Sequence, residues 1–339
     1  MNIQEAIRAV MNRRDLGYDE MSAVMRQIMT GEATNAQIGG FLVGLQMKRE
    51  SVPEIAAAAE VMRELATKVR VEGDALVDIC GTGGDGADLF NVSTGAMFIV
   101  AAAGGRVAKH GNRSVSSSSG SADLLEAAGA KLDLDPEAVG ECVDRVGVGF
   151  MFAPRHHSAM RHAVAARREM AVRTIFNLLG PLTNPAGARR QLLGVFADHW
   201  VRPLAEVLQR LGSERVMVVH SEDGLDEVSI AAPTHVAELD NGVIREYTIR
   251  PEDFGLASAS LDAVKVHTAV ESLDIIRRVY AGEPGPAADM LSLNAGASIY
   301  CAGLADSVEA GVERARAVLA DGAAGRRLEE FVHYTNRFE

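Results

Sequence analysis

Two segments of the sequence combine residue types that bind phosphate groups. The first is Gly81-Thr82-Gly83-Gly84-Asp85-Gly86, where closely spaced glycines let backbone N–H groups approach phosphate oxygens. The second is Lys109-His110-Gly111-Asn112-Arg113, which supplies three potential cations and one amide and is followed by six serines between positions 114 and 121. Arginine makes bidentate contacts with phosphate, and lysine acts as a point charge. A glycine cluster alone is equally typical of a tight turn, but the two segments together predict a site for a polyanion.

Hydroxyl and carboxylate side chains at two other places extend this prediction to a metal ion. Asn91-Val92-Ser93-Thr94 is a strong helix start, and its side chains suit either helix capping or a phosphate or metal-bound oxygen. Asp226 and Glu227 follow an expected strand at 216–220. Acidic loops are usually only solvated, but two adjacent carboxylates beside a polyphosphate suit Mg²⁺, which takes its remaining ligands from substrate oxygens and water.

The hydrophobic pattern predicts which elements position these residues. Apolar residues recur at helical spacing in 3–10, 21–29, 38–47 and 55–69; Gly31 marks a helix end, and Thr34–Gln37 and Ser51–Glu54 match the capping box. From residue 75 onward, short apolar runs at 76–80, 106–108, 192–196, 216–220 and 264–266 are interleaved with helical patterns at 93–103, 122–128, 203–211, 275–280 and 308–319. This interleaving predicts a mainly parallel sheet covered by helices, with the phosphate-binding segments at the C-terminal ends of adjacent strands.

The expected fold class is therefore α/β, with a small all-helical domain and a larger α/β domain. We expect the helical domain to span 1–72 and the α/β domain to span 73–339. Residues 173–190 contain two prolines and two asparagines that break any long helix, so we expect part of this segment to return to the helical domain before the sheet resumes.

Composition argues against several classes of protein. The 339 residues include 34 Lys and Arg against 46 Asp and Glu, and the net charge of −12 argues against a broad nucleic-acid surface. The longest apolar run, 96–103, is far shorter than the about 20 residues of a membrane span, and the N-terminus does not read as a signal peptide. Cys80, Cys142 and Cys301 are too scattered for a disulfide framework, so we expect a cytoplasmic protein. His156 and His157 are adjacent and lack a Cys companion, which disfavours a zinc site.

Six ordered motifs resemble those of one enzyme family over nearly the whole chain. The sequence contains GTGGDG, NVST, KHGNRSVSSSSGSAD, FMFAPRHHSAM, RTIFNLLGPLTNPA and DGLDE, and in this order they resemble the anthranilate phosphoribosyltransferase family. The resemblance implies transfer of the phosphoribosyl group from phosphoribosyl pyrophosphate (PRPP) to anthranilate in tryptophan biosynthesis, with Mg²⁺ as cofactor. It also implies a nucleoside-phosphorylase-like fold, a phosphoribosyl-binding and catalytic α/β domain, and a homodimer formed through the helical domain.

The resemblance also implies roles for individual residues. For anthranilate it implies Gly81, Asn112 and Arg167, with Arg167 facing the substrate carboxylate, while His110 and His157 line the path of the aromatic ring. The implied metal ligands are Ser93, Asp226 and Glu227. The implied PRPP-binding residues are Gly81, Gly84, Asp85, Asn91, Val92, Ser93, Thr94, Lys109, His110, Gly111, Asn112, Arg113, Ser114, Val115, Ser116, Ser117 and Ser121.

Four positions depart from the family pattern, and two alternative functions stay open. Leu89 stands where the family usually has Thr or Ser on the pyrophosphate side, and Ala165, Ala166 and Ala171 replace residues that are commonly Pro, Val and Gly near Arg167. One alternative is an enzyme resembling pyrimidine-nucleoside phosphorylase, against which the intact KHGNR and DGLDE motifs count. The other is a non-enzymatic, nucleic-acid-binding paralogue, which the acidic net charge disfavours.

Overall fold

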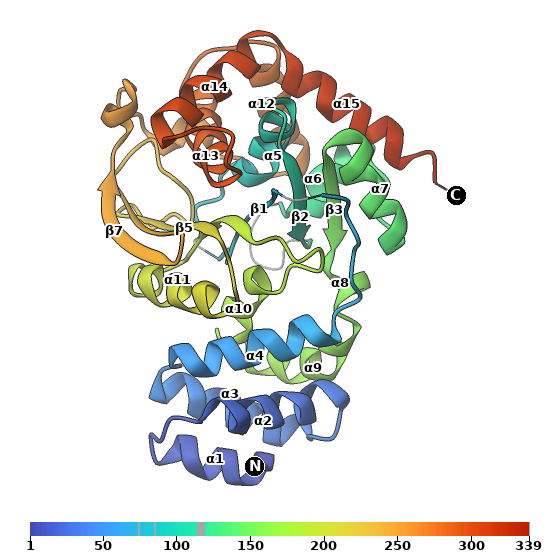
Figure 1. Ribbon diagram of the computed structural model, residues 1–339, viewed down its shortest axis with the longest axis vertical. Helices are drawn as coiled ribbons and strands as arrows, with labels where there is room; N and C mark the ends of the chain where they lie inside the picture. Colours follow the sequence, from blue (N-terminus) through green and yellow to red (C-terminus); the bar gives the residue numbers. More distant parts are fainter. Residues whose placement is uncertain (74, 85, 114–118, 339) are drawn as a thin grey trace.

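The computed structural model describes residues 1–73, 75–84, 86–113 and 119–338 and contains a helical domain and a larger α/β domain (Figure 1). The chain begins with four helices, α1 (Ile3–Met11), α2 (Tyr18–Thr30), α3 (Asn35–Lys48) and α4 (Val52–Leu65). These confirm the four predicted helical segments. The fourth helix is shorter than expected, because Ala66 adopts extended backbone angles of φ −70° and ψ 142° and starts the crossing to the α/β domain.

The predicted helix-end signals are present. Gly31 ends α2 with a left-handed φ of +83°, a conformation that glycine adopts without steric cost. At the start of α3, the Thr34 hydroxyl accepts a hydrogen bond from the Gln37 backbone N–H (3.3 Å), and the Gln37 side chain accepts one from the Thr34 N–H (2.9 Å). Both capping groups of the box are therefore satisfied.

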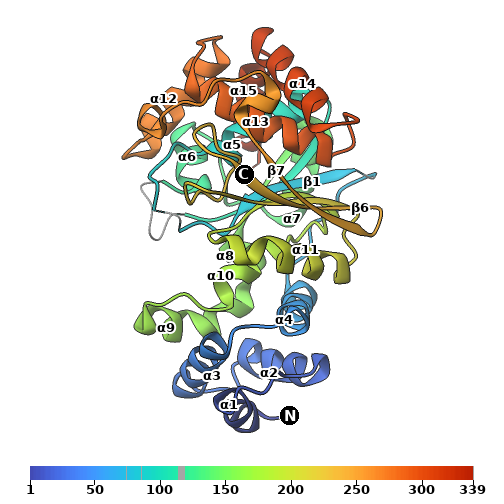
Figure 2. The same cartoon turned by 90° about the vertical axis from the view of Figure 1, so that its left-hand side faces the viewer.

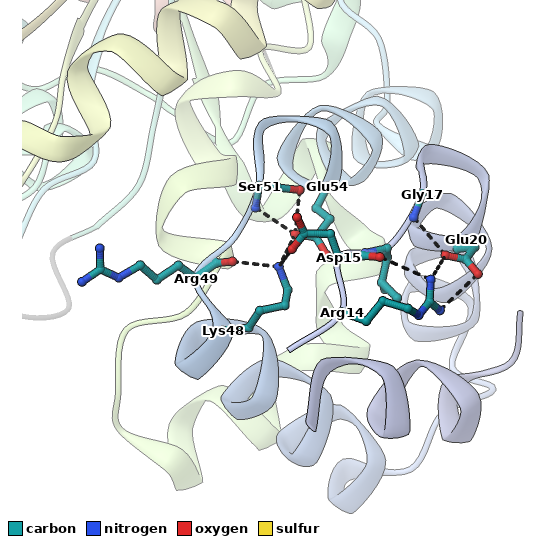
Figure 3. A network of polar contacts seen from close by, with 9 residues as sticks. Arg14, Asp15, Gly17, Glu20, Lys48, Arg49, Ser51 and Glu54 are labelled. Carbon is teal, nitrogen blue, oxygen red and sulfur yellow. Dashed lines mark hydrogen bonds and ion pairs between the residues drawn. The ribbon is translucent and has the colours of Figure 1, made fainter. Parts of the chain in front are cut away.

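The second predicted capping box forms part of a buried charged network (Figure 3). Glu54 is fully buried, and its carboxylate accepts hydrogen bonds from the Ser51 N–H (2.8 Å), the Ser51 hydroxyl (2.9 Å) and the Leu16 N–H (2.8 Å). Lys48 Nζ lies 2.8 Å from the same carboxylate and 2.6 Å from Asp15. The network joins the α1–α2 loop, the end of α3 and the start of α4, and its hydrogen bonds offset the desolvation of the carboxylate.

A mixed seven-stranded sheet forms the centre of the α/β domain (Figure 1). In spatial order the described strands are β3 (Val148–Phe152), β2 (Arg106–Gly111), β1 (Leu76–Gly81), β4 (Arg190–Gly194), β5 (Arg215–Ser221), β6 (Thr234–Asp240) and β7 (Val243–Ile249). The first five are parallel, and β6 and β7 are antiparallel. This confirms the expected mainly parallel sheet.

Helices cover both faces of the sheet, so the strands are buried between two hydrophobic clusters. One face packs against α5 (Val92–Ala102), α13 (Pro286–Cys301) and neighbouring helices, while α11 (Val201–Arg210) packs against β5 and β6 on the other face. The remaining helices of this domain are α6 (Ser121–Ala127), α7 (Pro136–Val146), α12 (Ala269–Tyr280), α14 (Val308–Ala320) and α15 (Ala323–Thr335), with 3₁₀ turns η3 (Asp198–Trp200), η4 (Pro251–Phe254) and η5 (Leu261–Val264).

The helical domain is completed by a later segment of the chain. After β3 come α8 (Ala153–His156), η1 (Ser158–Met160), α9 (Arg161–Met170), α10 (Phe176–Leu179) and η2 (Gly180–Leu182). Figure 2 shows this segment on the same side of the sheet as α1–α4, and α9 packs against α2 and α3. Ile175, Leu179 and Leu182 share a hydrophobic cluster with the first four helices.

One predicted strand is wrong. Residues 264–266 do not join the sheet, because Val264 ends the 3₁₀ turn η5 and Lys265 makes only an isolated bridge to Leu89. Val264 and Val266 are nevertheless buried, which explains the strand-like apolar pattern. In the part of the chain that the structure describes, no helix is long and apolar enough to cross a bilayer.

Candidate active site

The two phosphate-binding segments lie at the ends of adjacent parallel strands. Gly81 ends β1 and Gly111 ends β2, and these strands pair directly, with Leu76 opposite Arg106. The C-terminal ends of parallel strands meet at one edge of the sheet, where α/β proteins place ligands. The glycine loop and the basic segment are therefore brought together as the strand pattern predicts.

Each described residue of the glycine loop Thr82–Gly84 is held by a different part of the chain. The Thr82 N–H donates to Gly194 O at 2.9 Å, and the Gly83 N–H donates to the Asp226 carboxylate at 2.7 Å. The Arg173 guanidinium donates to Gly84 O. Gly84 has a φ of +79°, which favours glycine, so the loop conformation depends on both its glycines and these contacts.

Asp226 lies so close to two strand ends that only glycine fits there. A Cβ at Gly81 would lie 2.3 Å from Asp226 Oδ2, and one at Gly194 would lie 1.6 Å from Asp226 O. The Asp226 carboxylate is buried and Glu227 is half-buried. The predicted acidic pair therefore begins directly over the ends of β1 and β4, beside the glycine loop.

The start of α5 is joined to the basic segment by Lys109, which is only 1% exposed. Its Nζ donates to the Ser93 hydroxyl at 3.1 Å and to Ile79 O. Asn91 precedes α5, but its side chain makes no capping hydrogen bond. The Asn91 side-chain amide instead donates to Ser119 O (3.0 Å), and its oxygen accepts from the Ser272 hydroxyl (2.8 Å). Asn91 thus connects the start of α5 to Ser119 and to α12.

The remaining predicted PRPP residues differ in their surroundings. Val92 and Thr94 lie buried in the first turns of α5, and Ser121 begins α6. Arg113 forms ion pairs with Glu126 and, at 3.8 Å, with Asp123 of α6, so its guanidinium faces that helix. Asp85, Ser114, Val115, Ser116 and Ser117 lie outside the described residues.

A cavity of about 500 Å³ lies beside these strand ends, between the α/β domain and the helical domain. Gly81, Asn112 and Arg167, the three residues expected to bind anthranilate, all line it, together with His110 and His157. Its apolar lining includes Met62 of α4, Pro154, Met160, Val164 of α9 and Phe176 of α10. The cavity thus combines a polar edge at the strand ends with an apolar wall suited to a flat aromatic ring.

Arg167 carries a positive charge into this cavity. It is half-buried on α9, its guanidinium lies 5.3 Å from the Phe176 ring centroid, and burial lowers its pKa. Among the described residues, no carboxylate forms an ion pair with Arg167. A partly desolvated guanidinium of this kind is suited to bind a carboxylate from a ligand.

The two cavity histidines are neutral near pH 7. Their ring centroids lie 4.9 Å apart. Burial, followed by the neighbouring histidines, lowers the pKa of His110 to about 3, and burial followed by His156 lowers the pKa of His157 to about 4. Within the described part of the chain, the buried Nε2 atoms of His110 and His157 have no hydrogen-bond partner, so each is available to form a hydrogen bond with a polar atom of a ligand. His156 differs, because its Nδ1 lies 3.0 Å from Thr67 O at the crossing between domains.

The departures from the family pattern have local consequences. Leu89 packs against the core and bridges to Lys265, so it offers the site no side-chain hydrogen bond. Ala171 ends α9 with a left-handed φ of +51°, a conformation that costs alanine about 1 kcal/mol relative to glycine. Its N–H still bonds to Arg167 O at 3.1 Å, so the last turn of α9 is intact.

Several cavity and loop residues were not predicted from the sequence. Met62 lies in a predicted helix and Phe176 in the segment 173–190, and the sequence assigns neither of them to a binding site; it also gives no individual role to Arg173, which follows the end of α9 at Met170. The contact between Arg173 and the glycine loop joins residues that are far apart in the sequence, so no local pattern could reveal it. Among the described residues, no group of three His, Cys, Asp or Glu side chains could hold a metal ion.

Comparison with known proteins gives one consistent result. Residues 4–66 match the helical bundle domain of a glycosyl transferase family, and residues 73–325 match its a/b domain. The anthranilate phosphoribosyltransferases of Thioalkalivibrio sulfidiphilus and Alkalilimnicola ehrlichii are each 61% identical over 335 residues, covering 99% of both chains.

Solved structures agree with the sequence relatives. The anthranilate phosphoribosyltransferase of Thermus thermophilus has 47% identity and a TM-score of 0.93, covering 98% of this chain and 99% of that one. The Saccharomyces cerevisiae enzyme, solved in complex with PRPP and Mg, shares the fold with a TM-score of 0.89 at 24% identity, covering 99% of this chain and 98% of that one. The present chain has the same helical domain and mainly parallel sheet, and it matches these relatives over nearly its whole length. It therefore belongs to the anthranilate phosphoribosyltransferase family.

Proposed function

We propose that this chain transfers the phosphoribosyl group of PRPP to the amino group of anthranilate, giving N-(5-phosphoribosyl)anthranilate and pyrophosphate in tryptophan biosynthesis. The observation that carries the proposal is the cavity in which Gly81, Asn112 and Arg167 converge beside the glycine loop. Family membership supports the same reaction. In this assignment residues 73–339 form the catalytic domain, and residues 1–72 with part of 173–190 form the helical domain.

PRPP binds at the strand ends in this proposal. The backbone of Gly84 and the N-terminus of α5 face its phosphates, where the helix dipole favours negative charge, while the N–H groups of Thr82 and Gly83 hold the loop to Gly194 and Asp226. Lys109 is bonded to Ser93 at this helix start and adds a positive charge behind it. The same assignment includes Gly81, Asn91 and the residues of the basic segment, because they border this edge of the sheet.

The side-chain types of Asp226, Glu227 and Ser93 suit a magnesium ion. Asp226 and Glu227 supply hard carboxylate oxygens, and Ser93 supplies a hydroxyl. Mg²⁺ is bound by few protein carboxylates and completes its octahedron with water and phosphate oxygens. When bound, the ion would neutralise negative charge on the departing pyrophosphate. The Gly83 N–H, 2.7 Å from Asp226, holds the carboxylate in place for this role.

The protein residues position the aromatic amine rather than ionise it. The anthranilate amine is neutral and nucleophilic, so no strong base is needed to generate it. Arg167 binds the substrate carboxylate, Asn112 lies at the strand end near the sugar, and the apolar wall excludes water from the ring. Because His110 and His157 are neutral, they place no additional positive charge beside the attacking nitrogen.

Replacing Arg167 by Ala tests this assignment. Loss of one charge-assisted interaction costs about 1.5–3 kcal/mol, so KM for anthranilate is expected to rise about 10- to 100-fold, with a much smaller change in KM for PRPP. Steady-state rates are followed through the loss of anthranilate fluorescence with PRPP and Mg²⁺ present. Equal changes in both KM values would exclude the carboxylate-binding role of Arg167.

We also propose a cytoplasmic homodimer that forms through the helical domain. Met11 of α1 and Met47 of α3 are each 73% exposed, and Val43 of α3 is 40% exposed. Figure 1 shows α1 at the end of the molecule remote from the sheet. Helices α1 and α3 pack against each other, and exposed apolar side chains on neighbouring helices are typical of a subunit interface. The three cysteines are buried and unpaired, as in a reducing compartment, and cell fractionation tests the location.

A further inference from the structure

Arg173 makes two contacts that together fix its guanidinium beside the glycine loop. Its Nη2 donates to Gly84 O, and its guanidinium carbon lies 4.3 Å from the Phe196 ring centroid. The Phe196 N–H donates to the Thr82 hydroxyl at 2.9 Å. Arg173, Phe196, Thr82 and Gly84 therefore form a closed set of contacts, which we name the loop clamp.

The loop clamp joins segments from both domains. Arg173 follows α9, the helix that carries Arg167, and the left-handed turn at Ala171 separates the two arginines. Phe196 follows β4 and Gly84 follows β1 in the α/β domain. Arg173 is the member of the clamp that reaches across from the helical domain to the glycine loop.

The glycine loop needs such a contact because of its backbone. Gly83 and Gly84 have positive φ values of +65° and +79°, and glycine has the most conformational freedom to lose when a loop is ordered. Thr82 and Gly83 are held from within the α/β domain, by Gly194 and Asp226. Arg173 supplies the contact that holds Gly84.

We infer that Arg173 is a positioning residue for PRPP, acting through the Gly84 carbonyl and the Phe196 ring rather than by touching the reacting atoms. This inference rests on the proposed function. Arg173 is exposed, so removing its side chain leaves the hydrophobic clusters intact. Removing the side chain loosens the glycine loop at Gly84, and hence weakens the binding of the phosphates that lie beside Gly84 in the proposed function.

The test compares Arg173→Ala, Arg173→Lys and Phe196→Leu with the wild type. We expect Arg173→Ala to raise KM for PRPP about tenfold, equivalent to about 1.4 kcal/mol, with less than a threefold change in KM for anthranilate. Arg173→Lys keeps the positive charge but loses the planar guanidinium that stacks on Phe196. We therefore expect its KM for PRPP to lie between that of the wild type and that of Arg173→Ala. Phe196→Leu keeps the backbone bond to Thr82 and is expected to raise KM for PRPP in the same direction.

Arg168→Ala is the matched control, since Arg168 is an exposed arginine near the end of α9, the helix that precedes Arg173, with no described contact to the loop. Titration calorimetry of PRPP with Mg²⁺ measures binding without turnover, and thermal unfolding reports stability. A KM for PRPP in Arg173→Ala equal to that of the control would overturn the inference, as would an equal rise in both KM values. If wild type and control form no product from PRPP and anthranilate, the proposed function itself fails, which distinguishes the two outcomes.

Discussion

Replacing Gly81 by Ala tests whether the Asp226 carboxylate must stay where the structure has it. The new Cβ would lie 2.3 Å from Asp226 Oδ2 and 3.0 Å from its Cγ, far inside ordinary van der Waals contact. The carboxylate must therefore move by roughly 1 Å, which breaks its bond to the Gly83 N–H. A hydrogen bond to a charged group contributes about 1.5–3 kcal/mol, so activity is expected to fall about 10- to 100-fold.

The assay measures initial rates against Mg²⁺ concentration with both substrates saturating. If Asp226 binds the metal, Gly81→Ala is expected to raise the half-saturating Mg²⁺ concentration about tenfold, and Asp226→Asn should shift it in the same direction. Gly325→Ala is the matched control: Gly325 lies in α15, and its Cβ would lie 3.5 Å from Tyr280 Cβ, which is ordinary van der Waals contact. An unchanged Mg²⁺ titration and turnover in Gly81→Ala would refute the reasoning.

Three further predictions concern stability and assembly. Glu54→Ala leaves the buried Lys48 amine with the exposed Asp15 as its remaining carboxylate partner and removes the acceptor of the Leu16 and Ser51 N–H groups. Urea unfolding should therefore show a loss of about 3–5 kcal/mol, against less than about 1 kcal/mol when the surface residue Glu64 of the same helix is replaced by Ala. Because burial lowers the pKa of His110 to about 3 and of His157 to about 4, the unfolded chain binds protons that the folded chain excludes. The free energy of unfolding should therefore fall as pH drops from about 6.5 towards 4, by up to about 1.4 kcal/mol per unit for each histidine, and replacing both by Asn should flatten the fall. Met47→Asp should raise the dimer dissociation constant at least tenfold by analytical ultracentrifugation; a wild-type monomer would contradict the dimer.

The elements with strong local signals were predicted well from the sequence. The first four helices have apolar residues at helical spacing and capping residues such as Thr34 with Gln37, and the structure contains both the helices and this capping box. The strands that carry Gly81 and Gly111 were predicted because a short apolar run precedes each polar segment. Their adjacency followed from the parallel arrangement.

Features that depend on distant contacts were not predicted. Residues 264–266 read as a strand, but the pattern reports only their burial, and no neighbouring strand pairs with them beyond the bridge to Leu89. The edge strand β7 was missed because its exposed, charged residues give it no continuous apolar run. The contacts of Arg173 with Gly84 and Phe196, and the ion pairs of Arg113 with α6, depend on tertiary packing that spacing alone does not encode.

The late completion of the helical domain has a consequence for synthesis on the ribosome. Helices α1–α4 emerge first, but α9 and α10, which complete their hydrophobic cluster, follow roughly a hundred residues later. At a synthesis rate of about 5–20 residues per second, part of the apolar surface of the first four helices stays exposed for on the order of ten seconds before α9 and α10 are made. During that interval the Glu54 network, whose residues all lie within the first 54 positions, can already join the α1–α2 loop to α3 and α4. The Glu54 network can thus stabilise the packing of these helices before α9 and α10 have been synthesised.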